Sequence, residues 1–129
     1  MGRIITQVKV TNGFEPEKTI SLDGLVDTGE TYLTLPMAWK GTLGKLDQVD
    51  EVEFELANGE TGIGEVCGPV RIAIANLRPI YGEVLFIKMP ENENGEYEPL
   101  IGYLPLEAIP VAVDMLGHRL VKIRAVDLK

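Results

Sequence analysis

Apolar and polar residues alternate with a period of two along much of this chain. The clearest case lies between Asp47 and Leu56, where Val52 and Phe54 alternate with glutamates. This period is typical of a β-strand that buries one face and exposes the other. Alternation, or a β-branched and aromatic composition, also predicts strands over 4–10, 19–22, 31–35, 63–66 and 70–74, and the apolar run 84–87 predicts a buried strand. The pattern therefore predicts an all-β fold.

Turn residues separate the predicted strands. Asn58-Gly59 is the strongest hairpin signal, and it joins the strand that ends at Leu56 to the strand over 63–66. Pro36 is favoured at the first position of a helix, so a short helix is expected from there to near Gly41 or Gly44. We also expect a surface loop over 90–99, a second short helix over 106–109, and a hairpin with strands at 111–113 and 120–123 around Gly117-His118.

Length, composition and charge narrow the possible classes of protein. The 129 residues have the size of a single domain, so residues 1–129 are expected to form one. The formal net charge of −8 argues against nucleic acid or an anionic membrane as a partner. The first residues become polar too soon for a signal-peptide core, and no apolar run is long enough to span a bilayer. The expected location is the cytoplasm.

The residue types that most often bind metals or form covalent intermediates are scarce. Cys67 is the only cysteine and His118 the only histidine. An intrachain disulfide is therefore impossible, and a structural zinc site would lack thiolates. Cys67 is expected to be a buried, inert thiol. The acidic run in 90–99 lacks the spacing of an EF-hand, so no metal and no cofactor is predicted.

Asp27-Thr28-Gly29 follows the apolar pair Leu25-Val26 directly. This order places a carboxylate in a tight turn at the end of a buried strand. Such a carboxylate can be an acid–base catalyst, or it can belong to an ordinary strand-ending turn. The second half of the chain repeats the pattern, because Leu100-Ile101-Gly102 is also followed by Leu-Pro and a predicted short helix. The repetition suggests a pseudo-symmetric β barrel.

Taken in order, these motifs resemble those of a retropepsin-type aspartic protease, particularly the small single-domain bacterial relatives of the retroviral enzymes. The resemblance covers roughly residues 4 to 123, including segments 111–114 and 119–121. It implies a closed or partly open β barrel of the retropepsin type with one or two short helices. It also implies an endopeptidase in which two copies of Asp27 meet across the axis of a homodimer and activate water to cleave a peptide or protein substrate.

The resemblance assigns roles to the residues around Asp27. Thr28 would donate hydrogen bonds across the dimer, and Gly29 would leave room for the substrate backbone. The flap that closes over the substrate would be formed by Ala57, Asn58, Gly59, Glu60 and Thr61. Leu100, Ile101 and Gly102 would be a buried brace behind the catalytic loop.

Two features depart from the family pattern. Glu30 follows the triplet where the family commonly has Ala or Ser. If Glu30 faces the cleft, a dimer gathers four carboxylates whose repulsion disfavours full ionisation; Glu30 can instead face solvent. The flap sequence also lacks a large apolar residue at its tip. These features leave open a weakly active or inactive dimer that binds extended peptides. Phosphoryl transfer through Asp27 is a weaker alternative, since no Gly-rich phosphate loop accompanies it.

Overall fold

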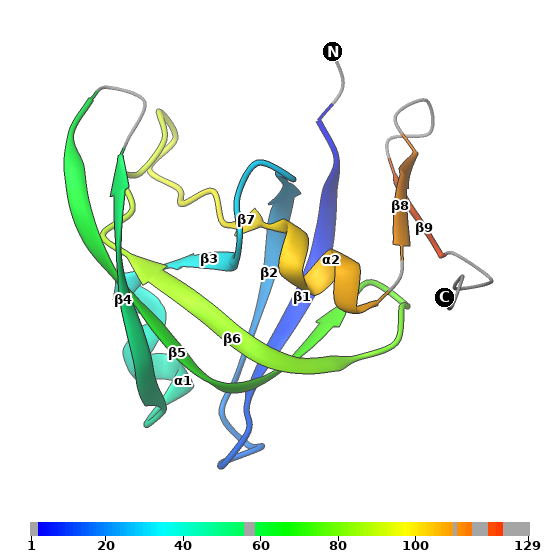
Figure 1. Ribbon diagram of the computed structural model, residues 1–129, viewed down its shortest axis with the longest axis horizontal. Helices are drawn as coiled ribbons and strands as arrows, with labels where there is room; N and C mark the ends of the chain where they lie inside the picture. Colours follow the sequence, from blue (N-terminus) through cyan, green and yellow to red (C-terminus); the bar gives the residue numbers. More distant parts are fainter. Residues whose placement is uncertain (1–2, 56–58, 110, 115–118, 123–129) are drawn as a thin grey trace, which may run out of the picture.

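The computed structural model describes residues 3–55, 59–109, 111–114 and 119–122, and its main feature is a curved β-sheet (Figure 1). The flap residues Ala57 and Asn58 and the predicted turn at Gly117-His118 lie outside the described residues. The elements are β1 (Ile5–Asn12), β2 (Thr19–Val26), β3 (Leu33–Pro36), η1 (Met37–Trp39), α1 (Lys40–Leu43), β4 (Asp47–Glu55), β5 (Thr61–Ile74), β6 (Ile80–Ile87), β7 (Leu100–Ile101), α2 (Tyr103–Ala108), β8 (Val111–Asp114) and β9 (Arg119–Lys122). Within the described residues, no helix has the length and apolar character needed to cross a membrane.

Six strands close into a barrel. The order in the sheet is β1-β2-β7-β3-β6-β5, and β1 pairs with β5 to complete the circle. β4 extends from the outer side of β5, and β8 and β9 form a separate two-stranded sheet. The predictions of a mostly β fold, of a β barrel and of short helices are therefore confirmed.

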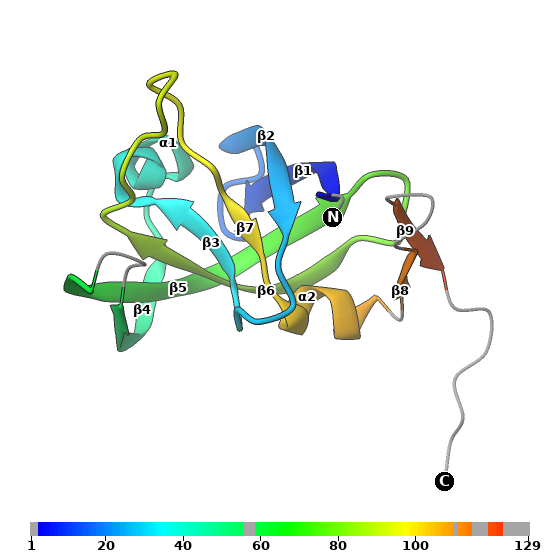
Figure 2. The same ribbon diagram turned by 90° about the horizontal axis from the view of Figure 1, so that it is seen from above.

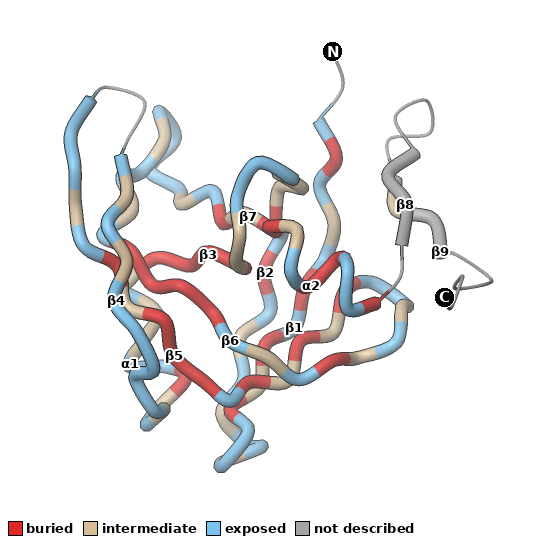
Figure 3. Tube along the Cα trace, viewed as in Figure 1, coloured by how far each residue is buried: buried red, intermediate tan, exposed pale blue. Residues whose placement is uncertain are grey.

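The core lies inside the barrel and follows from the period-two pattern. Successive side chains of a strand point to opposite faces, so one set of alternating residues in each strand is removed from water. Val8, Ile72 and Phe86 belong to this buried set, and Figure 3 shows buried segments along β1, β5 and β6. Buried Asn12 joins β1 to α1, because its Nδ2 donates to the carbonyls of Leu43 at 2.7 Å and of Lys45 at 2.9 Å.

Several element boundaries differ from the sequence predictions: β1 continues past residue 10 to Asn12, β2 continues past residue 22 to Val26, and β6 begins at Ile80 and not at 84. β5 is one strand from Thr61 to Ile74, not two, because the chain passes Pro69 through a shift in register where no ladder hydrogen bond is needed. α2 begins at Tyr103 and not at 106, since a proline in the first helical turn lacks only an N–H that has no partner there. β3 begins at Leu33 because residues 31 and 32 belong to the preceding loop.

The predicted short helix after Pro36 is confirmed. It consists of η1 and α1, and it ends at Gly44, whose φ of 78° is easily adopted by glycine.

Candidate active site

Asp27 lies in the loop 27–32 that joins β2 to β3. The side chain is partly buried, whereas Thr28, Gly29 and Glu30 are exposed. The Asp27 Oδ1 accepts the backbone N–H of Gly29 at 3.1 Å, and the Asp27 carbonyl accepts the N–H of Glu30 at 3.1 Å. These bonds form a tight turn that orients the carboxylate relative to its own backbone.

β7 fixes the loop from behind. This short strand lies between β2 and β3, parallel to the first and antiparallel to the second. Ile101 pairs with Val26 on one side and with Leu33 on the other, and its carbonyl accepts the N–H of Asp27 at 3.0 Å. Ile101 is fully buried. One buried residue therefore contacts both strands from which the Asp27 loop extends.

Gly102, the N-cap residue of α2, and the first turn of the helix hold the second half of the loop. Three backbone N–H groups donate to three loop carbonyls: Gly102 to Tyr32 at 3.1 Å, Tyr103 to Glu30 at 2.9 Å and Leu104 to Thr31 at 3.0 Å. The first N–H groups of a helix have no acceptor within the helix, so this contact satisfies both segments. In Figures 1 and 2, α2 lies next to the loop between β2 and β3.

Gly102 is packed against the loop so closely that no side chain fits. A Cβ atom at this position would lie 2.5 Å from the Tyr32 carbonyl oxygen and 2.6 Å from the Thr31 carbonyl carbon. Both neighbours are backbone atoms, which cannot rotate away. The segment Leu100-Ile101-Gly102 and the segment 27–30 are thus brought together as one hydrogen-bonded unit.

The predicted flap belongs to the hairpin of β4 and β5. The hairpin and the Asp27 loop extend toward the same end of the molecule (Figure 1). Glu55 pairs with Thr61 below the tip, and the described flap residues Gly59, Glu60 and Thr61 are all exposed. Gly59 has a φ of 87°, a conformation that favours glycine in a turn.

A small apolar cluster connects the base of the hairpin to the Asp27 loop. Its buried members are Val66, Leu85 and Ile87, and the partly buried side chains that pack on them are Tyr32, Val52, Phe54 and Met89. Tyr32 ends the Asp27 loop, whereas Phe54 belongs to the hairpin. Sequence reasoning considered only the polar tip and missed Phe54, although its alternation with glutamates was the signal for a side chain that faces inward.

An ion pair attaches strand β5 of the hairpin to α1. Lys40 Nζ of α1 lies 2.6 Å from Glu65 Oε1 of β5. This hydrogen bond raises the pKa of Lys40 above its ordinary value, although partial burial acts in the opposite direction. Cys67, two residues further along β5, is fully buried as expected, and burial raises the pKa of its thiol. A protonated, enclosed thiol is a poor nucleophile.

The segment 88–99 packs beside the strand that leads to Asp27. The Pro99 carbonyl accepts the N–H of Leu25 at 2.9 Å, and an ion pair of 3.2 Å links Arg3 to Glu98. A cavity of about 140 Å³ opens between this segment and β1 and β2, with Leu25 and Tyr97 in its lining. A side-chain-sized pocket therefore lies next to a residue two positions before Asp27.

The described residues contain no group of three or more His, Cys, Asp or Glu side chains that could hold a metal ion. The sequence matches no model of a known protein family and no curated protein. The geometry supplies one oriented and partly exposed Asp27 carboxylate at the end of the molecule toward which the β4–β5 hairpin also extends (Figure 1).

Proposed function

We propose that this protein is an aspartic endopeptidase of the retropepsin type, active as a homodimer. The observation that carries the proposal is the insertion of β7 between β2 and β3, which fixes the loop of Asp27 through the Ile101 carbonyl and the close contact of Gly102. Acid–base catalysis needs a carboxylate held in a defined position and accessible to substrate. The partly buried Asp27 in an otherwise exposed turn meets both requirements.

In the proposed reaction two Asp27 carboxyl groups, one from each protomer, share one site. Two carboxyl groups in contact do not both ionise, because their negative charges would repel each other. One group is therefore a carboxylate and the other a carboxylic acid. The carboxylate takes a proton from water while the water oxygen attacks the carbonyl carbon of the peptide. The carbon–nitrogen bond of the tetrahedral intermediate then breaks, and the leaving nitrogen receives a proton from the pair. Water is consumed, and a carboxylic acid and an amine are released.

The exposed side of the loop supports the need for a second copy. Thr28, Gly29 and Glu30 are exposed, and the Thr28 hydroxyl makes no hydrogen bond to a described residue of its own chain. A partner loop could use this hydroxyl as a donor and acceptor. The proposal therefore requires dimers, which light scattering at increasing protein concentration would detect; a strict monomer would contradict it.

Substitution of the central residue is the direct test. Asp27→Asn keeps the size of the side chain and removes its base function, so we expect peptide cleavage to fall by roughly a thousandfold or more. Asp23→Asn is the control, because Asp23 is an exposed aspartate on β2, the strand that leads to Asp27. Cleavage of unstructured protein substrates would be followed from acid to neutral pH. Equal cleavage by wild type and Asp27→Asn would overturn the proposal.

A second candidate is a dimer of the same fold that binds extended peptides with little or no turnover. The exposed Glu30 beside the triplet and the polar, exposed hairpin residues Gly59, Glu60 and Thr61 favour it. This candidate predicts that wild-type protein binds peptides and leaves them intact. Glu30→Ala discriminates further: if repulsion from Glu30 suppresses catalysis, the variant gains cleavage, and the gain disappears when Asp27→Asn is added.

A further inference from the structure

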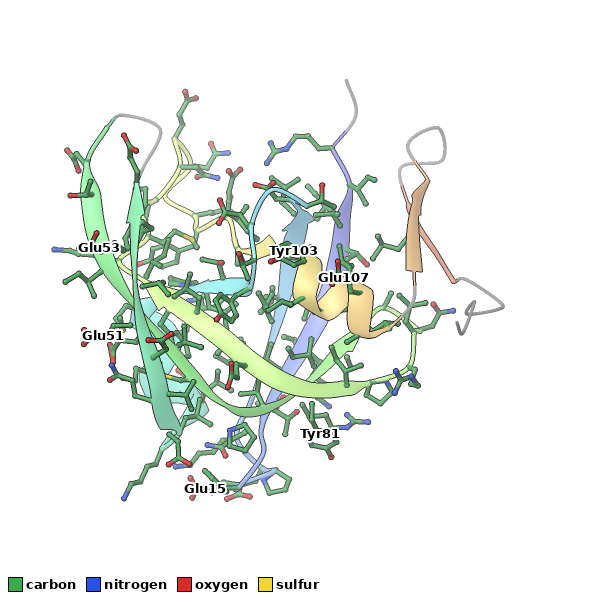
Figure 4. All side chains as sticks on the ribbon, viewed as in Figure 1. Glu15, Glu51, Glu53, Tyr81, Tyr103 and Glu107 are labelled. Carbon is green, nitrogen blue, oxygen red and sulfur yellow. The ribbon has the colours of Figure 1, made fainter. Side chains whose placement is uncertain are left out.

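A second, larger depression adjoins the end of the Asp27 loop at Tyr32 and does not include Asp27 in its lining. It has a volume of about 530 Å³ and runs across β6, between α2 and the beginning of β4. Pro69 and Ile72 of β5 and Ile80 of β6 contribute apolar lining. In Figure 4, Tyr81 extends below β6, whereas α2, with Tyr103 and Glu107, lies above the strand. We name this depression the β6 groove.

Exposed apolar side chains gather at the β6 groove. Six large hydrophobic residues of the described chain are strongly exposed, and three of them line this groove. They are Val49 at 52% exposure, Tyr81 at 71% and Leu104 at 41%, and they come from β4, β6 and α2. Single exposed apolar residues are ordinary, but a group rimmed by polar residues is typical of an interaction surface.

The charged side chains that line the β6 groove have one sign. Asp47 and Glu83 line it, and no lysine or arginine of the described chain does. Tyr32 also lines the groove, and its pKa is raised, first by burial and then by the negative charges of Glu83 and Asp50. Its hydroxyl therefore stays neutral and available as a hydrogen-bond donor. The groove thus combines apolar contact area with two acidic side chains in its lining, and Arg78 lies at its edge, where Nη2 donates to the carbonyl of the lining residue Ala108 at 2.7 Å.

We propose that the β6 groove docks a segment of a partner protein that combines apolar and basic side chains. Apolar side chains of the segment would pack between Tyr81 and Leu104, and lysine or arginine would pair with Asp47 and Glu83. Charge argues against a second copy of this chain as the occupant, since its net charge of −8 would repel the groove. The inference does not depend on peptidase activity, because the Asp27 carboxylate is not part of the groove.

The test uses the full chain with Asp27→Asn, so that a peptide is not cleaved during the measurement. The probes are two labelled peptides of about 12 residues, one alternating leucine and tyrosine with lysine and the other carrying glutamate in place of lysine. We expect saturable binding of the lysine peptide and at least about tenfold weaker binding of the glutamate peptide. Amide chemical shifts should change at Gly68, Gly82 and Leu104, which line the groove.

Substitutions locate the binding. Tyr81→Ser and Glu83→Lys should each weaken binding of the lysine peptide about tenfold. Glu17→Lys is the matched control for charge, because Glu17 is exposed and lies on the turn between β1 and β2; it should change the affinity less than about threefold.

Three results would overturn the inference. The first is the absence of saturable binding by the lysine peptide. The second is binding that Ile63→Ser, in the hairpin, weakens while the groove variants do not, since the peptide would then occupy the region of the candidate active site. The third is a change in oligomeric state caused by Tyr81→Ser, which would make the groove an interface between copies of this chain.

Discussion

The Asp27 loop and the β4–β5 hairpin reach the same end of the molecule but are held very differently. Asp27 and the residues after it are bonded to β7 and to the first turn of α2, and Ile101 behind them is fully buried. β4, in contrast, is the outermost strand of the sheet and has no buried residue along its whole length. The loop is fixed by several independent contacts, whereas β4 pairs with β5 alone, and the hairpin is otherwise attached to the barrel by the β5 pairings, a small apolar cluster and an ion pair.

This difference matches what the proposed reaction requires of each region. A carboxylate that moves a proton must keep its position, because misplacement by about 1 Å can cost roughly a hundredfold in rate. A flap must instead open and close, and segments with little buried apolar surface open at low cost in free energy. We therefore expect that a substitution in the loop support lowers the stability of the whole fold, whereas a substitution in the hairpin affects mainly the hairpin itself.

The largest effect is expected from Gly102→Ala. The added methyl group collides with the backbone of Thr31 and Tyr32, so the loop must move or α2 must detach. We expect a loss of roughly 2 to 4 kcal/mol in the free energy of unfolding, measured by urea denaturation. Gly41→Ala in α1 is the matched control, since nothing lies within 4 Å of its Cβ position, and it should be neutral or stabilising by up to about 1 kcal/mol. Equal stabilities of the two variants would show that β7 and α2 do not fix the loop.

A smaller and local effect is expected from Phe54→Ala. The Phe54 ring covers Gly62 on the neighbouring strand, where a Cβ atom would lie 2.6 Å from the ring. Loss of the ring uncovers this glycine and removes a partly buried member of the cluster beneath the hairpin. We expect a loss of about 1 kcal/mol or less in global stability, but faster hydrogen exchange at the amides of residues 51–55 and 62–66.

The amides of Asp27 and Tyr103 provide the internal control for Phe54→Ala. Both donate to backbone carbonyls of the loop support and should keep their exchange rates. Faster exchange at these two amides would mean that the hairpin and the loop form one cooperative unit, which would remove the distinction between the two regions.

Most strands could be predicted from the sequence because their signal is local. The alternation of Val52 and Phe54 with glutamates, and the apolar run 84–87, each define a strand without knowledge of its neighbours. The prediction failed at Pro69, because a register shift within β5 depends on the partner strand and not on the proline alone. It also placed the start of α2 too late, since the loop carbonyls that accept the first helical N–H groups are distant in sequence.

The candidate site was predictable in part for the same reason. Asp27-Thr28-Gly29 is a local motif. In contrast, no side chain fits at Gly102 because the backbone of Thr31 and Tyr32, about 70 residues earlier, lies against it. The β6 groove was not predicted, because Val49, Tyr81 and Leu104 come from three separate elements and carry no common sequence pattern.

The smallest effect is expected at the ion pair that joins the hairpin to α1. The hydrogen bond to Glu65 raises the pKa of Lys40 above 10.5, so the folded state holds this proton more tightly than the unfolded state does. The contribution of the pair is therefore complete below pH 10.5 and is lost as the pH rises through the higher pKa of the folded state. Lys40 is about one-third exposed, which limits the contribution to less than about 1 kcal/mol.

The difference in urea midpoint between wild type and Lys40→Met isolates this contribution. The pKa values of Cys67 and Tyr32 are also raised, so stability should fall in alkaline solution with or without Lys40. Because the charge of Lys40 lowers the pKa of Cys67, the comparison is made in a Cys67→Ala background, and the effect of Tyr32 is then common to both proteins. We expect the difference to be constant from neutral pH to about pH 9 and to shrink above pH 10.5. A difference that does not change with pH would mean that Lys40 stabilises the junction through its aliphatic chain, and that the hairpin is attached to the barrel by packing alone.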